Sequence, residues 1–231
     1  FYQRTLAGDA NEITEMAEHQ LKQAPLSAYY RDVALEGLRL AQIDAENGLI
    51  DEDHMERISN TVEMMVDNLW DVSEISRAST TERKDADEGS ADGSDEDHET
   101  THVPVLEPDD RAPGWQAEGA VICVPAKSKI DEAAAHILTH LICRHGVDAE
   151  VASDSISLFR EQADKTSQAR LICICSMSAN LAQSRYLARR IARRFPKARI
   201  VVVIWGGHQD TCAAFAKSEE KFIALVTNSL Q

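Results

Sequence analysis

The stretch "ARLICICSMSANLAQSRYLARRIARRFPKARIVVVIWGG", residues 169–207, carries the strongest signal for the fold of this 231-residue chain. It holds two continuous apolar runs, at 171–175 and 200–204, with a region of helical periodicity between them. Continuous apolar runs are typical of strands buried on both faces of a sheet, and a helix between two such strands makes a parallel crossover. The stretch therefore predicts a strand–helix–strand unit of an α/β domain.

The same alternation continues on both sides of this unit. Further strands are expected in "GAVICVPA" (119–126), "VDAEVAS" (147–153) and "IALVTNS" (223–229), and further helices in "IDEAAAHILTHLICRHG" (130–146), "SISLFREQADKTS" (155–167) and "TCAAFAKSEEKF" (211–222). Five apolar strands separated by helices predict a doubly wound, Rossmann-like parallel sheet over residues 115–231.

Charge divides the chain into three segments. Residues 1–74 hold 16 acidic and 5 basic residues, residues 75–114 hold 12 and 4, and residues 115–231 hold 11 and 15. Apolar residues recur at helical spacing in the first segment, which predicts a small helical bundle. The second segment has almost no apolar residue before Val103, so we expect a disordered acidic linker that lets the flanking domains move independently.

Composition excludes several classes of protein. No run approaches the ~18 apolar residues of a membrane-spanning helix, and no signal peptide is present. The chain begins "FYQRTLAGD" without Met, and we interpret it as part of a longer protein. Its five cysteines are odd in number and lie mostly in apolar runs, which favours reduced thiols in a cytosolic core over disulfides.

One predicted helix, within 180–196, has a basic face that does not mix with its apolar face. The residues of this basic face, together with one lysine beyond it, are Arg185, Arg189, Arg190, Arg193, Arg194 and Lys197. The pattern is typical of an amphipathic surface helix, and guanidinium groups also suit an anionic partner. A net charge of −15 and the lack of an aromatic platform argue against nucleic acid. The remaining partners are the acidic linker or helical domain of the same chain, or an anionic lipid.

Ligands of open α/β sheets bind beyond the carboxyl ends of the strands. The candidate ligand-binding residues in the loops expected there are Ser128, Ser176, Ser178, Asn180, Gly206 and Gly207. Serine and asparagine are equally typical of helix N-caps, and paired glycines of a plain strand-to-helix turn. No G-x-G-x-x-G or P-loop pattern occurs, so we expect neither a dinucleotide nor a P-loop site.

No spacing of nucleophile, base and acid predicts catalysis, so we expect a protein that is not an enzyme and has no catalytic residue. His136, His140 and Cys143 share one face of the helix expected at 130–146. That face lies opposite the large apolar residues, and no acid follows the first histidine as in H-E-x-x-H. We expect all three to be surface residues, with no metal or other cofactor bound.

The order of a helical bundle followed by this α/β pattern resembles cobalamin-binding domains. Their motif is D-x-H-x-x-G in the first loop, then Ser after the third strand and Gly-Gly after the fourth. Ser176 and Gly206–Gly207 match, whereas Pro125, Lys127 and Ile130 stand where Asp, His and Gly belong. The resemblance implies a similar architecture without the cobalamin ligand, and a ligand-sensing signalling module as an alternative function.

A second resemblance covers roughly 190 residues. "FYQRTLAGDANEITEMAEHQLKQAPLSAYYRDVALEGLRLAQIDAENG", "VICVPAKSKIDEAAAHILTHLICRHG" and "SRYLARRIARRFPKARIVVVIW" resemble the region that follows the membrane domain in long bacterial PerM-like transport proteins of the autoinducer-two exporter family. The resemblance implies a regulatory or assembly module on the cytoplasmic side of the bacterial inner membrane. Its partner would be an upstream membrane domain of the same polypeptide, and a homo-oligomer is compatible with this arrangement.

Overall fold

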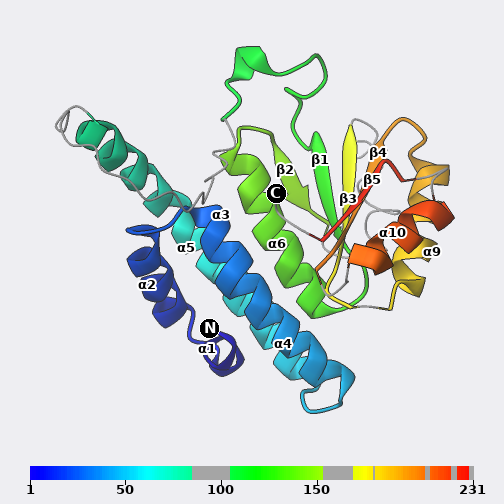
Figure 1. The fold of residues 1–231 in the computed structure, drawn as a ribbon, viewed down its shortest axis with the longest axis horizontal. Coiled ribbons are helices and arrows are strands. Elements are labelled where there is room, and N and C mark those ends of the chain that lie inside the picture. Colours follow the sequence, from blue (N-terminus) through cyan, green and yellow to red (C-terminus); the bar gives the residue numbers. More distant parts are fainter. Residues whose placement is uncertain (85–104, 153–168, 179, 206–208, 220–222, 229–231) are drawn as a thin grey trace, which may run out of the picture.

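The protein is described by a computed structural model in which residues 1–84, 105–152, 169–178, 180–205, 209–219 and 223–228 are placed. A helical part at one side packs against an α/β part at the other (Figure 1). The helix expected at 155–167, both candidate glycines Gly206 and Gly207, and the most acidic part of the expected linker lie outside the described residues.

The sheet has five strands, all parallel, in the order β2-β1-β3-β4-β5. The strands are β1 (Val121–Pro125), β2 (Ala149–Val151), β3 (Leu171–Ser176), β4 (Arg199–Ile204) and β5 (Leu225–Thr227). This confirms the expected doubly wound fold. The chain leaves β1 toward β2 on one side and places β3 on the other, so the strand order reverses between β1 and β3.

The helical part is made of α1 (Tyr2–Ala7), α2 (Ala10–Leu21), α3 (Leu26–Tyr29), a π-helical turn (Tyr30–Ala34), α4 (Leu35–Glu46) and α5 (Glu52–Lys84). Pro25 precedes α3, and Gly48, with a φ of 71°, lies in the turn between α4 and α5. Helix α5 continues ten residues beyond the domain boundary expected at residue 74. No Gly or Pro occurs from 49 to 88, so no residue breaks the helix where the acidic composition begins.

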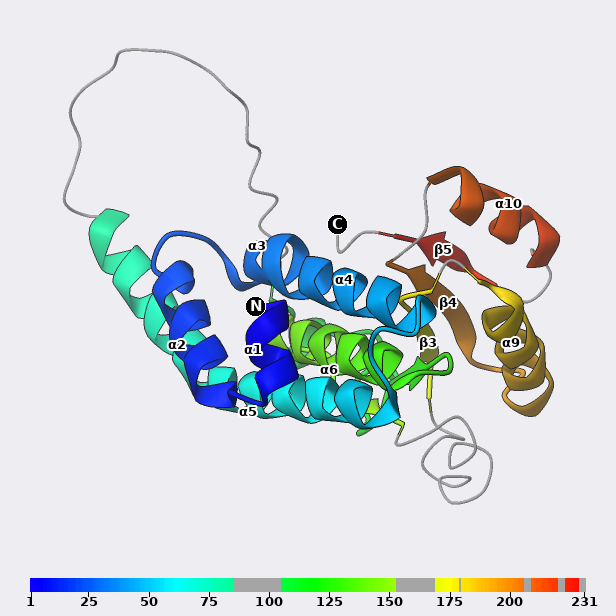
Figure 2. The ribbon, with the colours of Figure 1, turned by 90° about the horizontal axis from the view of Figure 1, so that it is seen from below.

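Helix α6 (Lys129–Arg144) lies between the bundle and the sheet and contacts both α4 and α5 (Figures 1 and 2). One hydrophobic core joins Leu38 and Met65 of the bundle to Ile130, Ala134 and Ile137 of α6. On its other side, α6 packs through Ala135 against strands β1 and β3. The packing contradicts the expectation of two independently moving parts, because α6 joins the bundle in one hydrophobic core and the sheet in a second.

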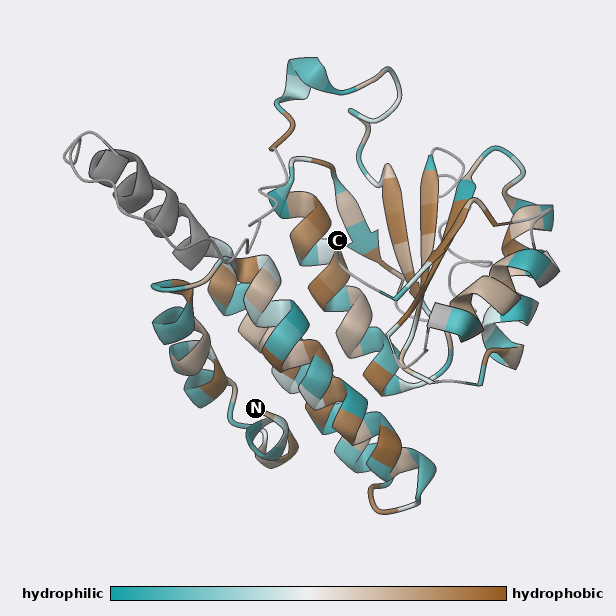
Figure 3. Cartoon of the chain, viewed as in Figure 1, coloured by the Kyte–Doolittle hydropathy of each residue, from teal (hydrophilic) through white to brown (hydrophobic). Residues whose placement is uncertain are grey.

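Helices α9 (Ala182–Arg194) and α10 (Gln209–Glu219) cover the opposite face of the sheet. Leu187 and Ile191 of α9 and Phe215 of α10 pack there on Ile172 and Val202. Figure 3 shows the result: hydrophobic strands lie in the middle, and the surrounding helices carry hydrophilic residues.

Candidate functional site

A cleft of about 900 Å³ lies at the carboxyl ends of β1 and β3, where the strand order reverses. This is the position at which open α/β sheets bind ligands. Its lining comes from both parts of the molecule. The sheet side contributes Lys127, Ser128, Asp131, Ser176, Ser178 and Asn180, and the bundle side contributes Gln42, Glu46, Glu52 and Met55.

The structure brings four of the six candidate ligand-binding residues into this cleft: Ser128, Ser176, Ser178 and Asn180. Gly206 and Gly207 lie outside the described residues. Sequence reasoning missed the whole opposite wall, because Gln42 and Glu46 belong to a helix that periodicity assigned only to the bundle. The available signal was the Asn47–Gly48 pair that ends this helix, and it is the same in a helix end that only meets solvent.

The carboxylate of Asp131 holds the two loops of the cleft together. Asp131 Oδ2 accepts hydrogen bonds from the backbone N–H groups of Lys127 and Ser128, both at 2.9 Å. Its Oδ1 accepts from Met177 N, in the loop after β3, at 2.6 Å. The side chain is 2% exposed, and this burial raises the pKa of the Asp131 carboxyl even though the three amides act in the opposite direction.

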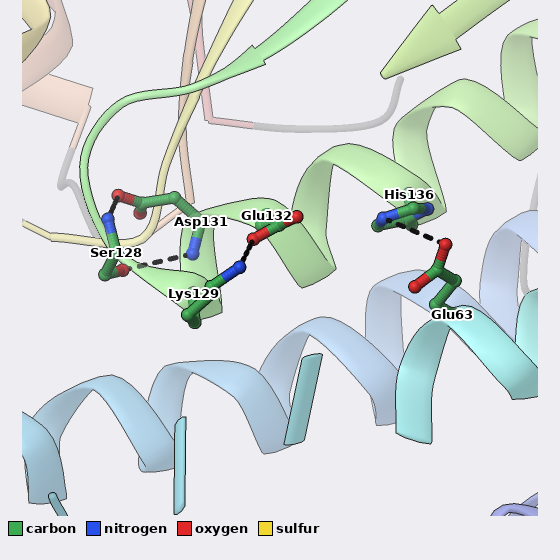
Figure 4. Close-up of polar contacts among 6 residues, drawn as sticks. All are labelled: Glu63, Ser128, Lys129, Asp131, Glu132 and His136. Atoms are coloured by element: carbon green, nitrogen blue, oxygen red, sulfur yellow. Dashed lines mark hydrogen bonds and ion pairs between the residues drawn. The ribbon is translucent and has the colours of Figure 1, made fainter. Parts of the chain in front are cut away.

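Ser128 has the second role foreseen for it, as the N-cap of α6. Its Oγ accepts a hydrogen bond from Asp131 N at 3.1 Å, and with the Asp131 carboxylate it forms a capping box (Figure 4). Next to it, Lys129 Nζ pairs with Glu132 Oε2 at 2.7 Å. Ser128 and Asp131 therefore begin helix α6 and also line the cleft.

Hydrogen bonds connect the two walls of the cleft. Ser178 Oγ donates to Glu46 Oε1 at 2.7 Å, and Gln42 Nε2 donates to the same oxygen at 2.9 Å. Ser128 Oγ lies 3.5 Å from Gln42 Oε1 in a weaker contact. Ser178 Oγ also accepts from Asn180 N at 3.0 Å, so the loop after β3 is tied to the end of α4.

The expectation that His136, His140 and Cys143 are surface residues is wrong for His140, which is fully buried. Tyr30 Oη lies 2.7 Å from His140 Nδ1, and the ring of Trp70 stacks on the imidazole at a centroid distance of 4.8 Å. The face of α6 that looked solvent-exposed is covered by the bundle. Burial, with a smaller contribution from Arg144, lowers the pKa of His140 to about 4.

The other two residues of that group are partly buried. His136 Nε2 lies 3.9 Å from Glu63 Oε1 of α5 (Figure 4), and Cys143 Sγ donates to Ala149 O at 3.5 Å. Cys173 and Cys175 are buried beneath α6 beside Cys123. Hydrogen bonding to Cys123, together with burial, raises the pKa of both thiols. Within the described residues no group of His, Cys, Asp and Glu side chains is arranged to hold a metal ion.

The basic face of α9 lies where periodicity placed it. Arg185, Arg189, Arg190, Arg193 and Arg194 are exposed and line a groove of about 860 Å³ with Tyr186. Lys197 is exposed in the turn after the helix. Leu187, Ala188 and Ile191 on the opposite side are buried against the sheet, so the predicted amphipathic helix is confirmed. The guanidinium of Arg185 lies 5.3 Å from the ring centroid of Phe215.

Comparison of the chain with protein-family models, with curated proteins and with solved structures gives no match. Among the helices that the structure describes, none is both long and apolar enough to cross a bilayer.

Proposed function

We propose that this chain is the cytosolic regulatory or assembly module of a PerM-like membrane transport protein, and that a small polar molecule acts on it by binding in the cleft between bundle and sheet. The observation that carries the proposal is the double origin of the cleft, whose walls come from α4 and α5 on one side and from the β1 and β3 loops on the other. The resemblance of three long segments to the tail of such transporters supports the membrane setting.

A cleft between two packed parts suits regulation. Its volume of about 900 Å³ is sufficient for a small molecule. A ligand that contacts both walls binds one relative arrangement of the parts more tightly than others, and it shifts the population toward that arrangement. In a transporter, such a shift in the cytosolic module would be passed to the membrane domain.

The hydrogen bonds of the lining hydroxyls support binding over catalysis. Ser176 Oγ donates to the carbonyl of Ser178 at 3.3 Å, and Ser178 Oγ donates to Glu46. No histidine is among the described lining residues, so no serine there is paired with an imidazole base.

The membrane setting is tested on the natural gene product carrying a C-terminal tag. We expect the tagged protein to stay with membranes after an alkaline carbonate wash, and the reading frame upstream of Phe1 to encode apolar spans. Release of the full-length product into the soluble fraction, without upstream spans, would reject the transporter assignment. The ligand-sensing module would then be the better proposal, because the cleft does not depend on a membrane partner.

The cleft is tested by blocking it. Ser178→Trp would fill the space between Glu46 and the β3 loop, and Asp109→Trp, on an exposed turn, is the matched control. In a metabolite screen by thermal shift, we expect a compound that stabilises the wild type and the control but not Ser178→Trp. Compounds that stabilise all three proteins equally would place the binding site elsewhere.

A further inference from the structure

The switch point of this sheet already contains a carboxylate. The backbone N–H groups of Lys127, Ser128 and Met177 point into the space between the loops after β1 and β3, at the N-terminus of α6. Such converging amides, together with a helix N-terminus, make a position that favours an anion. All three donate to the Asp131 side chain, at 2.6–2.9 Å.

We infer that Asp131 is a built-in substitute for a ligand anion, and that the cleft therefore takes a small non-anionic molecule rich in hydrogen-bond donors and excludes phosphates and carboxylates. This inference rests on the proposed function in assuming that the cleft binds a ligand at all. The occupation of the anion position by Asp131 is testable without any such ligand.

The charges that line the cleft also favour a non-anionic ligand. Its described lining holds three carboxylates, on Glu46, Glu52 and Asp131, and one cation, on Lys127. An incoming phosphate would meet this negative surplus and would find the three amides already bonded. A ligand hydroxyl or amine meets acceptors instead.

The acceptor best placed for a ligand is Glu46. Both hydrogen bonds from Ser178 and Gln42 go to Oε1 of this carboxylate. Neither uses Oε2, which can accept from a ligand hydroxyl or amine without breaking the contact between the walls. Glu46 is thus the residue expected to orient a donor-rich ligand.

Removal of the Asp131 carboxylate tests its role directly. In Asp131→Ala the three amides lose their acceptor, and the vacated space opens onto the cleft. We expect the melting temperature of this variant to rise by about 2–4 °C with added formate, which replaces the missing carboxylate, relative to the same concentration of chloride. The wild type should show no such difference between the two salts.

Asp148→Ala is the matched control. Asp148 also accepts a backbone hydrogen bond, from Gly119 N, but it is exposed and lies at the amino end of β2, at the opposite edge of the sheet from the cleft. Formate should not stabilise this variant. Asp131→Asn fills the same volume without supplying two acceptors, so it should be destabilised and remain unresponsive to formate. If Asp131→Ala folds and formate does not raise its melting temperature, the proposal that the Asp131 carboxylate occupies the position of a ligand anion is wrong.

Selectivity is tested on the wild type, which does not depend on the folding of any variant. Glucose, glucosamine and glucose 6-phosphate share one scaffold and differ in charge. In ligand-observed NMR we expect the first two to give signals that Ser178→Trp abolishes, and the phosphorylated sugar to give none. Cleft-dependent binding of glucose 6-phosphate or inorganic phosphate would overturn the ligand class. If formate stabilises Asp131→Ala but neither glucose nor glucosamine binds the wild type, the role of Asp131 is supported. The same result would count against the cleft as a site for donor-rich ligands.

Discussion

Helices α6 and α9 cover opposite faces of the same sheet, but only α6 is covered on its outer side as well. Ala133, Ala134, Ile137 and His140 of α6 are buried, and most of their neighbours belong to the bundle. The outer side of α9 carries exposed arginines instead. One sheet thus has an inner helix that belongs to two cores and an outer helix that belongs to one.

Whether its outer side is covered determines the environment of the polar residues on each helix. On α6, His140 faces the bundle in a fixed arrangement: its Nδ1 lies 2.7 Å from Tyr30 Oη, and its Nε2 is buried without a hydrogen-bond partner among the described residues. On α9, the arginines are exposed on the outer side of the helix, and Arg185 and Arg194 lie over the rings of Phe215 and Phe195. The first helix joins the two parts of the molecule, and the second presents a surface.

The largest expected effect comes from placing the same side chain on the two outer faces. Ala134→Gln puts a bulky amide into the core shared by bundle and α6, and we expect the free energy of unfolding to fall by about 2–5 kcal/mol. Arg193→Gln on the exposed face of α9 should change it by no more than about 0.5 kcal/mol. Urea denaturation of both variants measures the two changes in the free energy of unfolding. If both are small, the bundle does not cover α6.

The next effect depends on pH and comes from His140. Its pKa is lowered to about 4 in the folded protein, against about 6.5 in an unfolded chain, so below pH 6.5 the unfolded state binds a proton that the folded state refuses. The contribution of neutral His140 to the free energy of unfolding is fully present above pH 6.5. About 3 kcal/mol of stability is lost as the pH falls to 4. Arg144, on the same helix, adds to the penalty on a charged imidazole.

His140→Gln isolates this term, because glutamine does not titrate and its amide can still bond to Tyr30. The difference in unfolding free energy between wild type and His140→Gln should narrow or reverse between pH 7 and pH 4.5. Other titrating groups, including Asp131, whose raised pKa acts with the opposite sign, are common to both proteins. A difference that is the same at both pH values would mean that His140 is hydrated in the folded protein.

A smaller effect is expected at the contact between the cleft walls. Ser178 and Glu46 are joined by a hydrogen bond of 2.7 Å across the two parts. A double-mutant cycle with Ser178→Ala and Glu46→Ala should give a coupling energy of about 0.5–1.5 kcal/mol. Ser178→Ala with Glu36→Ala, an exposed α4 residue paired with Arg39, should give none. Equal coupling energies in both cycles would show that Ser178 and Glu46 make no specific contact across the cleft.

The smallest effect concerns the basic face of α9, which we still predict to contact an acidic part of the same chain or an anionic lipid. Exposed ion pairs contribute about 0–1 kcal/mol each and are screened by salt. The radius of gyration from small-angle scattering should rise slightly with salt. Arg189, Arg190, Arg193 and Arg194, all replaced by Gln, should give the expanded value at low salt. If neither changes the radius, co-sedimentation with anionic liposomes decides whether the face binds lipid.

The same two helices show what the sequence can predict. The face of α9 was predictable because burial on one side leaves a periodic pattern of apolar residues and arginines. Helix α6 is buried on two sides. Apolar residues contact the bundle (Ile130, Ala133, Ala134, Ile137 and Leu141) as well as the sheet (Ala135, Leu138 and Ile142), so its sequence does not divide into one apolar and one polar face. The partners of His140, Tyr30 and Trp70, lie 110 and 70 residues earlier in the chain, and only the folded structure places them opposite the imidazole.

The cleft divides in the same way. Ser128, Ser176, Ser178 and Asn180 were predictable, because parallel strands bring their carboxyl-end loops to one edge. Gln42 and Glu46 were not, because their position depends on how the bundle packs on α6. The internal use of Asp131 was equally hidden, since an acid three residues after Ser128 indicates an N-cap and does not reveal that its second oxygen reaches Met177.

Hydrogen–deuterium exchange of the whole chain, followed by mass spectrometry, tests most directly whether α6 is an inner helix of both parts. Peptides covering α6 (129–144) and α9 (182–194) are compared in one experiment. If bundle and sheet share α6, its amides will exchange as slowly as those of β1 and β3 and markedly more slowly than those of α9, because opening α6 requires both cores to separate. Exchange of α6 as fast as that of α9 would contradict the packing of α6 in both cores, and with it the cleft between the two parts.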